Sequence, residues 1–344
     1  IAAHLANSER QVILLDLKGK ESPNQISEKA IDLIKKSDPP LLVERSRLGF
    51  IKPGNLTDDF DEIKDADWII EAVVERIDIK HTLYNQIDKV RSPHSIVSSN
   101  TSTIPLSILT QEMSDSMKSD FCITHFFNPV RFMRLLEIVE TPLMNVKKIS
   151  SLRDFCKNEL GKGIVNCNDT PGFIGNRIGV YAMQVAMYEA LDRGLNVEIA
   201  DALFGRPLGI PKTGVFGLYD LIGIDLMKDV LASFKKELQE NDPFMEVVKP
   251  HIIVEKLLEK GFTGNKGPGG FYETKTIDDN EIVKALNTSD MSYYDFDKVD
   301  LDIARRVEKE GIKALLNDES EYGRYAFAVL SKIINYSAFC IPEV

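Results

Sequence analysis

The sequence has little of what disulfide, metal and membrane proteins require. Its 344 residues include only four cysteines, and no two have the spacing of a zinc site or a redox motif. We therefore expect no metal site, and reduced core cysteines as in a cytosolic protein. There is neither a signal peptide nor an apolar run long enough to cross a bilayer. Acidic residues outnumber basic ones, with 53 Asp and Glu against 42 Lys and Arg. The resulting net charge of -11 disfavours nucleic acid and anionic membranes as general partners.

What remains is an ordinary globular composition, 28% charged and 43% hydrophobic. A chain of this length predicts two or three domains, since single hydrophobic cores stop growing at a smaller size. The chain begins with Ile1 rather than Met, so we expect that its start is missing.

Strand and helix patterns alternate along the first 140 residues. Short apolar runs at 11–17, 68–74 and 95–99 are typical of buried parallel strands, and residues 24–36 and 77–90 have helical spacing. This alternation predicts an α/β domain with a Rossmann-like, doubly wound parallel sheet.

The first of these runs ends in Asp16. In a dinucleotide-binding βαβ unit the second strand ends in an acid that binds the ribose hydroxyls of NAD. The alternative for an isolated acid is a solvent-facing strand end. The first strand and the Gly-rich turn that should precede such a unit are absent from the sequence. If the polypeptide began at Ile1, we would expect weak NAD binding and a sheet without a central strand.

The pattern changes near residue 169. Residues 169–177 open a long helix, and the pattern beyond stays helical, with a Gly-rich loop at 264–272 that lacks the Lys-Ser/Thr ending of a P-loop. We therefore predict three parts: residues 1–168 as the sheet domain, 169–273 as an all-α domain, and 274–344 as an additional, truncated helical segment with helices at 302–316 and 325–336.

His125 and Glu137 have the layout of an oriented general base. Residues 124–137 read as strand, turn and strand, with the histidine among aromatic residues and the carboxylate twelve positions on. Histidine changes charge near neutral pH, and a buried carboxylate on its second ring nitrogen would fix the tautomer. A core histidine with no chemical role is the alternative.

Small polar residues follow the predicted strand at 95–99. Asn100 and Ser102 would lie at the carboxyl edge of the sheet, where ligands of open α/β folds bind. Helix capping by the hydroxyl residues is the alternative, and the two roles are compatible.

Five motifs, taken together and in order, resemble the L-3-hydroxyacyl-CoA dehydrogenases of fatty-acid β-oxidation. They are Ser-Ser-Asn-Thr-Ser (98–102), Thr-His-Phe-Phe-Asn-Pro-Val (124–130), Leu-Leu-Glu-Ile-Val (135–139), Asp-Thr-Pro-Gly-Phe-Ile-Gly-Asn-Arg (169–177) and Gly-Gly-Phe-Tyr (269–272). The resemblance covers residues 1 to about 273. It implies reversible oxidation of L-3-hydroxyacyl-CoA to 3-ketoacyl-CoA, with hydride passing to NAD.

The resemblance also implies roles for individual residues. His125 would be the base and Glu137 its orienting partner, while Ser102 and Asn176 would hold the 3-oxygen of the substrate. The residues expected to line NAD are Asp16, Glu75, Lys80, Asn100, Ser102, Asn128 and Lys266. Those expected near the CoA phosphates are Lys35, Lys36 and Lys80; for Lys35 and Lys36 a solvated helix end is the alternative.

The segment after residue 273 resembles the longer bacterial, multifunctional members of the family, in which an enoyl-CoA hydratase domain follows. We therefore expect a bacterial cytoplasmic dehydrogenase cut from such a protein, with homodimerisation as a further expectation. Two alternatives stay open. One is a noncatalytic fragment or structural relative of the family, and the other is a different NAD-dependent hydroxyacid dehydrogenase.

Overall fold

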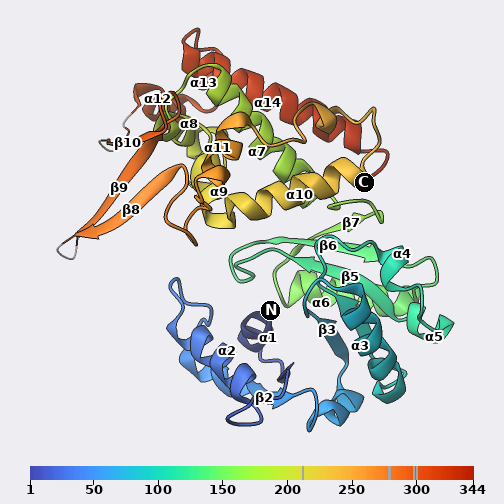
Figure 1. Ribbon diagram of the computed structural model, residues 1–344. Helices are drawn as coiled ribbons and strands as arrows, with labels where there is room; N and C mark the ends of the chain where they lie inside the picture. Colours follow the sequence, from blue (N-terminus) through green and yellow to red (C-terminus); the bar gives the residue numbers. More distant parts are fainter. Residues whose placement is uncertain (211–212, 278–279, 297–298, 300) are drawn as a thin grey trace. The chain divides into compact units, whose positions relative to one another are not determined.

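The computed structural model describes residues 1–210, 213–277, 280–296, 299 and 301–344. These residues form two compact units, one of Ile1–Ile174 with Val344 and the other of Gly175–Glu343 (Figure 1). Within the described residues, no helix is both long and apolar enough to cross a membrane.

The first unit contains a five-stranded sheet in the order β3-β4-β5-β6-β7. Its strands are β3 (Trp68–Glu71), β4 (Ile96–Ser99), β5 (Phe121–Phe126), β6 (Leu135–Glu140) and β7 (Gly163–Cys167). All pairs are parallel except β5 and β6, which are antiparallel. The predicted Rossmann-like sheet is confirmed, and the antiparallel pair agrees with the strand, turn and strand expected over 124–137, whose connection is too short for a crossover.

A separate two-stranded sheet is formed by β1 (Val12–Asp16) and β2 (Ile51–Asn55) in parallel register. Helices α1 (Ala2–Asn7) and α2 (Gln25–Lys36) pack against it around Ala6, Ile31 and Ile51. Within the described residues, β1 pairs with β2 alone and β3 pairs with β4 alone. The edge of β1 away from β2 is therefore unpaired, and Ile13 on that strand is 37% exposed.

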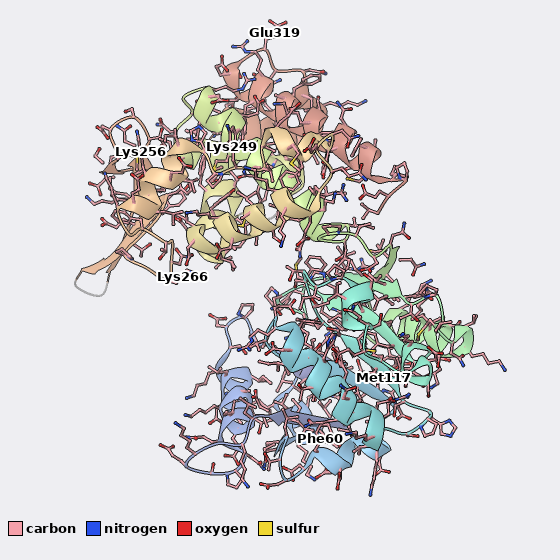
Figure 2. All side chains as sticks on the ribbon, turned by 45° about the vertical axis from the view of Figure 1, so that its right-hand side comes forward. Phe60, Met117, Lys249, Lys256, Lys266 and Glu319 are labelled. Atoms are coloured by element: carbon pink, nitrogen blue, oxygen red, sulfur yellow. The ribbon has the colours of Figure 1, made fainter. Side chains whose placement is uncertain are left out.

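Helices on both sides cover the five-stranded sheet. The buried face of α3 (Ile77–Val90) carries Tyr84 and Ile87, three positions apart, and α6 (Val146–Asn158) buries residues at the same spacing. Tyr84 and Ile87 share a core cluster with Met117, and Phe60 packs against its edge; Figure 2 labels the last two. The remaining short helices are η1 (Arg45–Phe50), η2 (Phe60–Asp65), α4 (Leu106–Leu109) and α5 (Asp115–Lys118).

The second unit is mainly helical, as predicted. Its longest helices, α7 (Gly175–Asp192) and α14 (Glu321–Cys340), contact one another along their lengths (Figure 1). Arg177 on α7 is buried between them, and its guanidinium bonds Asp242, Tyr336 and Glu343. The other helices are α8 (Val197–Leu203), η3 (Arg206–Leu208), α9 (Gly214–Ile222), α10 (Ile224–Glu237), η4 (Pro243–Glu246) and α11 (Ile252–Glu259).

The helical prediction for 274–344 is wrong at the beginning of that segment. A three-stranded antiparallel sheet occupies it, formed by β8 (Tyr272–Ile277), β9 (Asn280–Asn287) and β10 (Ser292–Asp295). The sequence there is rich in Thr, Ile, Val and Tyr, which favour strands.

The later part of this segment is helical. The single helix predicted over 302–316 is divided into α12 (Asp302–Glu310) and α13 (Lys313–Leu316) at Gly311, which has a φ of +79°. Residues 278–279, 297–298 and 300 of the segment lie outside the described residues.

Candidate active site

The antiparallel pairing of β5 and β6 places His125 directly opposite Glu137. Nδ1 of His125 lies 2.7 Å from Oε2 of Glu137, and both side chains are buried. A carboxylate at this distance accepts the Nδ1 proton, which leaves the lone pair of the neutral ring on Nε2. The two residues that the sequence paired as base and orienting acid are therefore in contact.

Glu137 is itself held through its other oxygen. Oε1 accepts the backbone N–H of Ile174 at 2.8 Å and the thiol of Cys167 at 3.8 Å. Burial raises the pKa of Cys167 to about 12, and the nearby charge of Glu137 adds to the effect. The thiol therefore stays protonated and serves as a weak donor to the carboxylate.

Ser102 occupies the opposite side of the imidazole. Its Oγ lies 3.0 Å from Nε2 of His125, the nitrogen that carries the lone pair. The rings of Phe127 and Phe173 lie beside the imidazole, with centroids 4.5 and 5.8 Å away. Nε2 therefore points to a polar hydroxyl between apolar walls, an arrangement that suits proton transfer from a bound alcohol to the ring.

Glu75 fixes the backbone at Ser102. Its Oε1 accepts both the N–H of Ser102 and the hydroxyl of Thr101 at 2.8 Å, and its Oε2 lies 3.1 Å from Nζ of Lys80. Burial alone raises the pKa of Glu75, but these hydrogen bonds and Lys80 outweigh it and bring the pKa below its ordinary value. Glu75 is therefore ionised around neutral pH, and the turn that carries Ser102 is anchored.

Asn100 links the same turn to the histidine strand. Its side-chain oxygen accepts the backbone N–H of Phe126 at 2.9 Å, next to His125. The structure therefore brings five predicted site residues into one hydrogen-bonded group within the first unit. They are Glu75, Asn100, Ser102, His125 and Glu137.

Lys80 is also bonded to this group, and its side chain is buried rather than exposed at the surface. The side chain is 1% exposed, and its ammonium bonds the fully buried Glu71 at 2.7 Å as well as Glu75. Sequence reasoning missed Glu71. In the sequence Glu71 is an acid within the apolar run 68–74, and this pattern does not distinguish a buried carboxylate from one that faces solvent.

Three further predicted residues lie on β1 and α2, outside the group around His125. Asp16 is exposed at the end of β1, where Oδ1 accepts the N–H of Leu17 at 2.6 Å. Lys35 pairs with Asp32 one turn away, and Lys36 is exposed at the end of the same helix.

Asn128 borders a small hollow of about 220 Å³ next to the hairpin turn. Arg131 also lines it, together with His4 and Leu41. Asn128 to Arg131, which line the hollow, follow His125 closely in the sequence.

The remaining predicted residues belong to the second unit. Asn176 is the second residue of α7, and Lys266 (labelled in Figure 2) lies in the Gly-rich loop, where Nζ pairs with Asp225 at 2.6 Å. Asp220 holds the end of this loop by accepting the N–H groups of Phe271 and Tyr272 at 2.9 and 2.7 Å. Burial raises the pKa of Asp220 to about 6.

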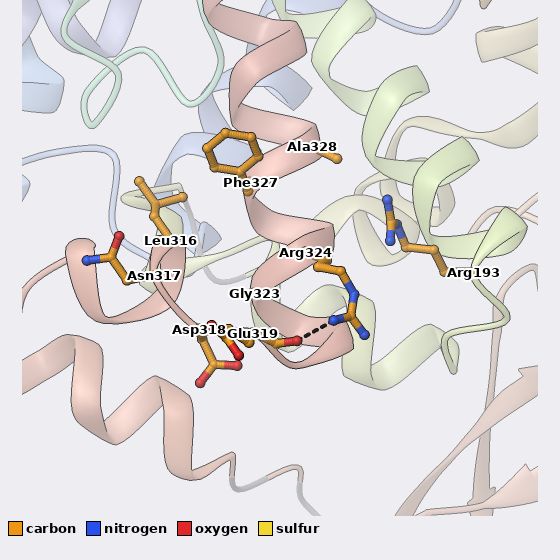
Figure 3. A pocket seen from close by; sticks show the side chains of 9 residues that line it. All are labelled: Arg193, Leu316, Asn317, Asp318, Glu319, Gly323, Arg324, Phe327 and Ala328. Atoms are coloured by element: carbon orange, nitrogen blue, oxygen red, sulfur yellow. Dashed lines mark hydrogen bonds between the residues drawn. The ribbon is translucent and has the colours of Figure 1, made fainter.

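A larger hollow of about 590 Å³ lies in the second unit, beside the beginning of α14 (Figure 3). Arg193, Arg324 and Phe327 line it, and both arginines pair with Glu321, at 3.3 and 3.1 Å. None of its lining residues is one that the sequence predicted, and the arginine charges are compensated locally. We therefore place the candidate active site at His125.

Two family models match the chain in succession. Residues 1–170 match the 3-hydroxyacyl-CoA dehydrogenase NAD binding domain, and residues 172–274 match the C-terminal domain of the same family.

Similar proteins carry related names. A putative fatty acid oxidation complex trifunctional enzyme of Rickettsia felis is 39% identical over the whole chain, which covers 47% of that protein. A probable 3-hydroxyacyl-CoA dehydrogenase of Deinococcus radiodurans is 34% identical, with 81% of this chain aligned to 80% of the relative. The crystal structure of 3-hydroxybutyryl-CoA dehydrogenase from Escherichia coli has a TM-score of 0.65 and 27% identity, covering 79% of this chain and 56% of that one. The chain spans about half the length of the Rickettsia relative.

Proposed function

The chain belongs to the 3-hydroxyacyl-CoA dehydrogenase family, and from this premise we propose that it oxidises L-3-hydroxyacyl-CoA to 3-ketoacyl-CoA with NAD in fatty-acid β-oxidation. The observation that carries the proposal is the chain of contacts from Glu137 through His125 to Ser102.

The chemistry requires a base at the substrate hydroxyl. An alcohol gives up hydride readily only if its proton leaves at the same time, so the base must lie within hydrogen-bond reach of the oxygen. Nε2 of His125 carries the available lone pair, and Glu137 stabilises the imidazolium that forms. Ser102 would hold the same oxygen from the side of Nε2, and Asn176 is the second residue that we assign to it.

NAD, when bound, supplies the hydride acceptor. Asp16 fits the ribose of a dinucleotide, because its carboxylate is exposed at the end of a parallel strand and ribose hydroxyls are donors. We assign Glu75, Asn100, Asn128, Ser102 and Lys266 to the rest of the cofactor site. Lys80 is buried, so we assign it an indirect role, holding Glu75 in place.

For the CoA end of the substrate we propose Lys35 and Lys36. Lys36 is exposed, and Lys35 pairs with Asp32 in a weak, solvent-screened ion pair, so both can turn to a phosphate at little cost. Lys80, the third residue expected there from the sequence, is 1% exposed and paired with Glu71 and Glu75, so we assign it no contact with the CoA phosphates.

The experiment is an assay of NADH consumption with acetoacetyl-CoA, using protein expressed from the gene that contains this sequence. We expect turnover in the unmodified protein and a loss of about a hundred- to ten-thousandfold in His125→Ala. His251→Ala is the matched control, because His251 caps α11 in the second unit and should leave turnover unchanged. Turnover retained in His125→Ala would refute the base assignment, and its absence in the unmodified protein would refute the reaction.

We also propose that the complete protein has an enoyl-CoA hydratase domain, that it forms homodimers, and that it works in a bacterial cytoplasm. The support is the trifunctional name of the longer Rickettsia relative and the four free, buried cysteines. Hydration of crotonyl-CoA and the mass in solution, measured on the same expressed protein, test the first two statements.

A further inference from the structure

Glu71, at the end of β3, is a buried carboxylate to which the reaction described above assigns no part. Its side chain is fully buried, and its oxygens accept four hydrogen bonds. Oε1 accepts from Val73 N and Lys80 Nζ, both at 2.7 Å. Oε2 accepts from Tyr84 OH at 2.5 Å and Ser99 Oγ at 2.7 Å. Burying such a charge is costly, and an apolar residue would stabilise the sheet as well or better.

Three connections run from Glu71 to the turn that carries Ser102. The backbone oxygen of Glu71 accepts the N–H of Asn100 at 2.8 Å. Ser99, bonded to the carboxylate, also accepts the N–H of Thr101 at 3.2 Å. Lys80, bonded to the same carboxylate, holds Glu75 at 3.1 Å, and Glu75 accepts the N–H of Ser102.

We propose that Glu71 is a positioning residue that sets Ser102 Oγ against Nε2 of His125. This inference rests on the proposed function, since it concerns the same site. The negative charge of Glu71 balances Lys80, so that Glu75 remains shared between Lys80 and the Ser102 turn. Without that charge, the ammonium of Lys80 has Glu75 as its remaining carboxylate partner and draws it away from the backbone of Ser102.

The first test is Glu71→Gln, which keeps the shape of the side chain and removes its charge. We expect kcat for acetoacetyl-CoA to fall on the order of ten- to a hundredfold, because small misplacements of a site group have effects of this size. KM should change little. In a Ser102→Ala background the same substitution should lower kcat less than twofold, because the residue through which it acts is already gone.

Asp120→Asn is the matched control for a buried ion pair. Asp120 is 5% exposed and pairs with Arg91 and Lys148 in the same unit, away from the site. It should lower thermal stability without lowering kcat. A Glu71→Gln loss that is equal in both backgrounds, or that Asp120→Asn reproduces, would overturn the proposal.

A second readout does not depend on turnover. The ¹⁵N chemical shift of Nε2 in His125 reports its hydrogen bond, and its signal can be assigned by its absence in His125→Ala. In Glu71→Gln we expect this shift to move toward that of Ser102→Ala. A shift that stays at the unmodified value would refute the positioning role, even if the protein proved inactive with acetoacetyl-CoA and the proposed function failed.

Two milder variants cover the case in which Glu71→Gln does not fold. Ser99→Ala and Tyr84→Phe each remove one hydroxyl donor from Oε2 of Glu71, but only Ser99 continues to Thr101. The shift of Nε2 should therefore change more in Ser99→Ala than in Tyr84→Phe. Equal changes, or none in either variant, would contradict the proposal.

Discussion

His125 and Glu137 are direct cross-strand neighbours, with 2.7 Å between Nδ1 and Oε2, in a hairpin whose two strands are almost entirely buried. The carboxylate also accepts the N–H of Ile174, so its orientation is fixed independently of the histidine. The base and its orienting acid are therefore built by local pairing within one hairpin. The position of Ser102, in contrast, depends on the turn after β4 and on the buried contacts of Glu71 and Lys80 with that turn.

Glu137→Gln should lower kcat strongly while leaving the fold intact. The amide keeps the size of the side chain and can still accept the N–H of Ile174, but it cannot stabilise a positively charged imidazolium. We expect kcat to fall about a hundredfold or more. Steady-state kinetics with acetoacetyl-CoA and NADH measure this, with circular dichroism as the check on folding. A loss of less than threefold would mean that Glu137 serves packing alone.

Ser102→Ala should lower kcat on the order of tenfold to a hundredfold, because the hydroxyl next to Nε2 of His125 is removed while the base remains. Thr103→Ala is the matched control, since Thr103 is the exposed next residue of the same turn. The two variants are compared by kcat under saturating substrate. Equal values for the two would show that the hydroxyl of Ser102 takes no part in the reaction.

The sequence carried enough information for the hairpin and much of its surroundings. The apolar run at 95–99 located β4, the strand, turn and strand over 124–137 indicated the hairpin of β5 and β6, and the helix predicted at 77–90 coincides with α3. It did not reveal Glu71, because an acid at the end of a strand has the same pattern whether it faces solvent or not. Only the packing of α3 and β4 against β3 brings Lys80, Tyr84 and Ser99 to its carboxylate.

The strands β8 to β10 were missed for a different reason. They lie between two segments with helical spacing, and residues 274–344 as a whole were predicted to continue that pattern.

Gly270→Ala should destabilise the second unit. A Cβ at this position would lie 1.9 Å from Oδ1 of Asp220, so that the carboxylate must move away from the N–H groups of Phe271 and Tyr272. We expect a loss of about 1–3 kcal/mol in the free energy of unfolding. Gly179→Ala is the control, because a Cβ there meets nothing within 4 Å on helix α7, and it should be neutral or stabilise by about 0.5–1 kcal/mol. Urea denaturation distinguishes the two, and similar midpoints would refute the steric argument.

Asp201 should make the stability of the second unit fall as the pH rises toward neutrality. Its carboxylate accepts the N–H groups of Phe216 and Gly217 and the hydroxyl of Tyr272, but burial outweighs these bonds and raises its pKa to about 7. The folded state therefore binds a proton that the unfolded chain releases near its ordinary value of 3.8. The free energy of unfolding is highest below that value and declines between about pH 4 and 7, by on the order of 4 kcal/mol from this group.

Asp201→Asn removes this titration, so its unfolding free energy should vary less across the same pH range, even if the variant is less stable overall. Asp220, with a pKa raised to about 6, contributes in the same direction and remains in the variant. Asp229→Asn is the control, because Asp229 is exposed on α10 and should leave the pH dependence unchanged. Urea denaturation at pH 4.5, 5.5, 6.5 and 7.5, a range chosen to span this window, gives the slopes. An Asp201→Asn slope as steep as that of the unmodified protein would show that Asp201 ionises in the folded state as readily as in the unfolded chain.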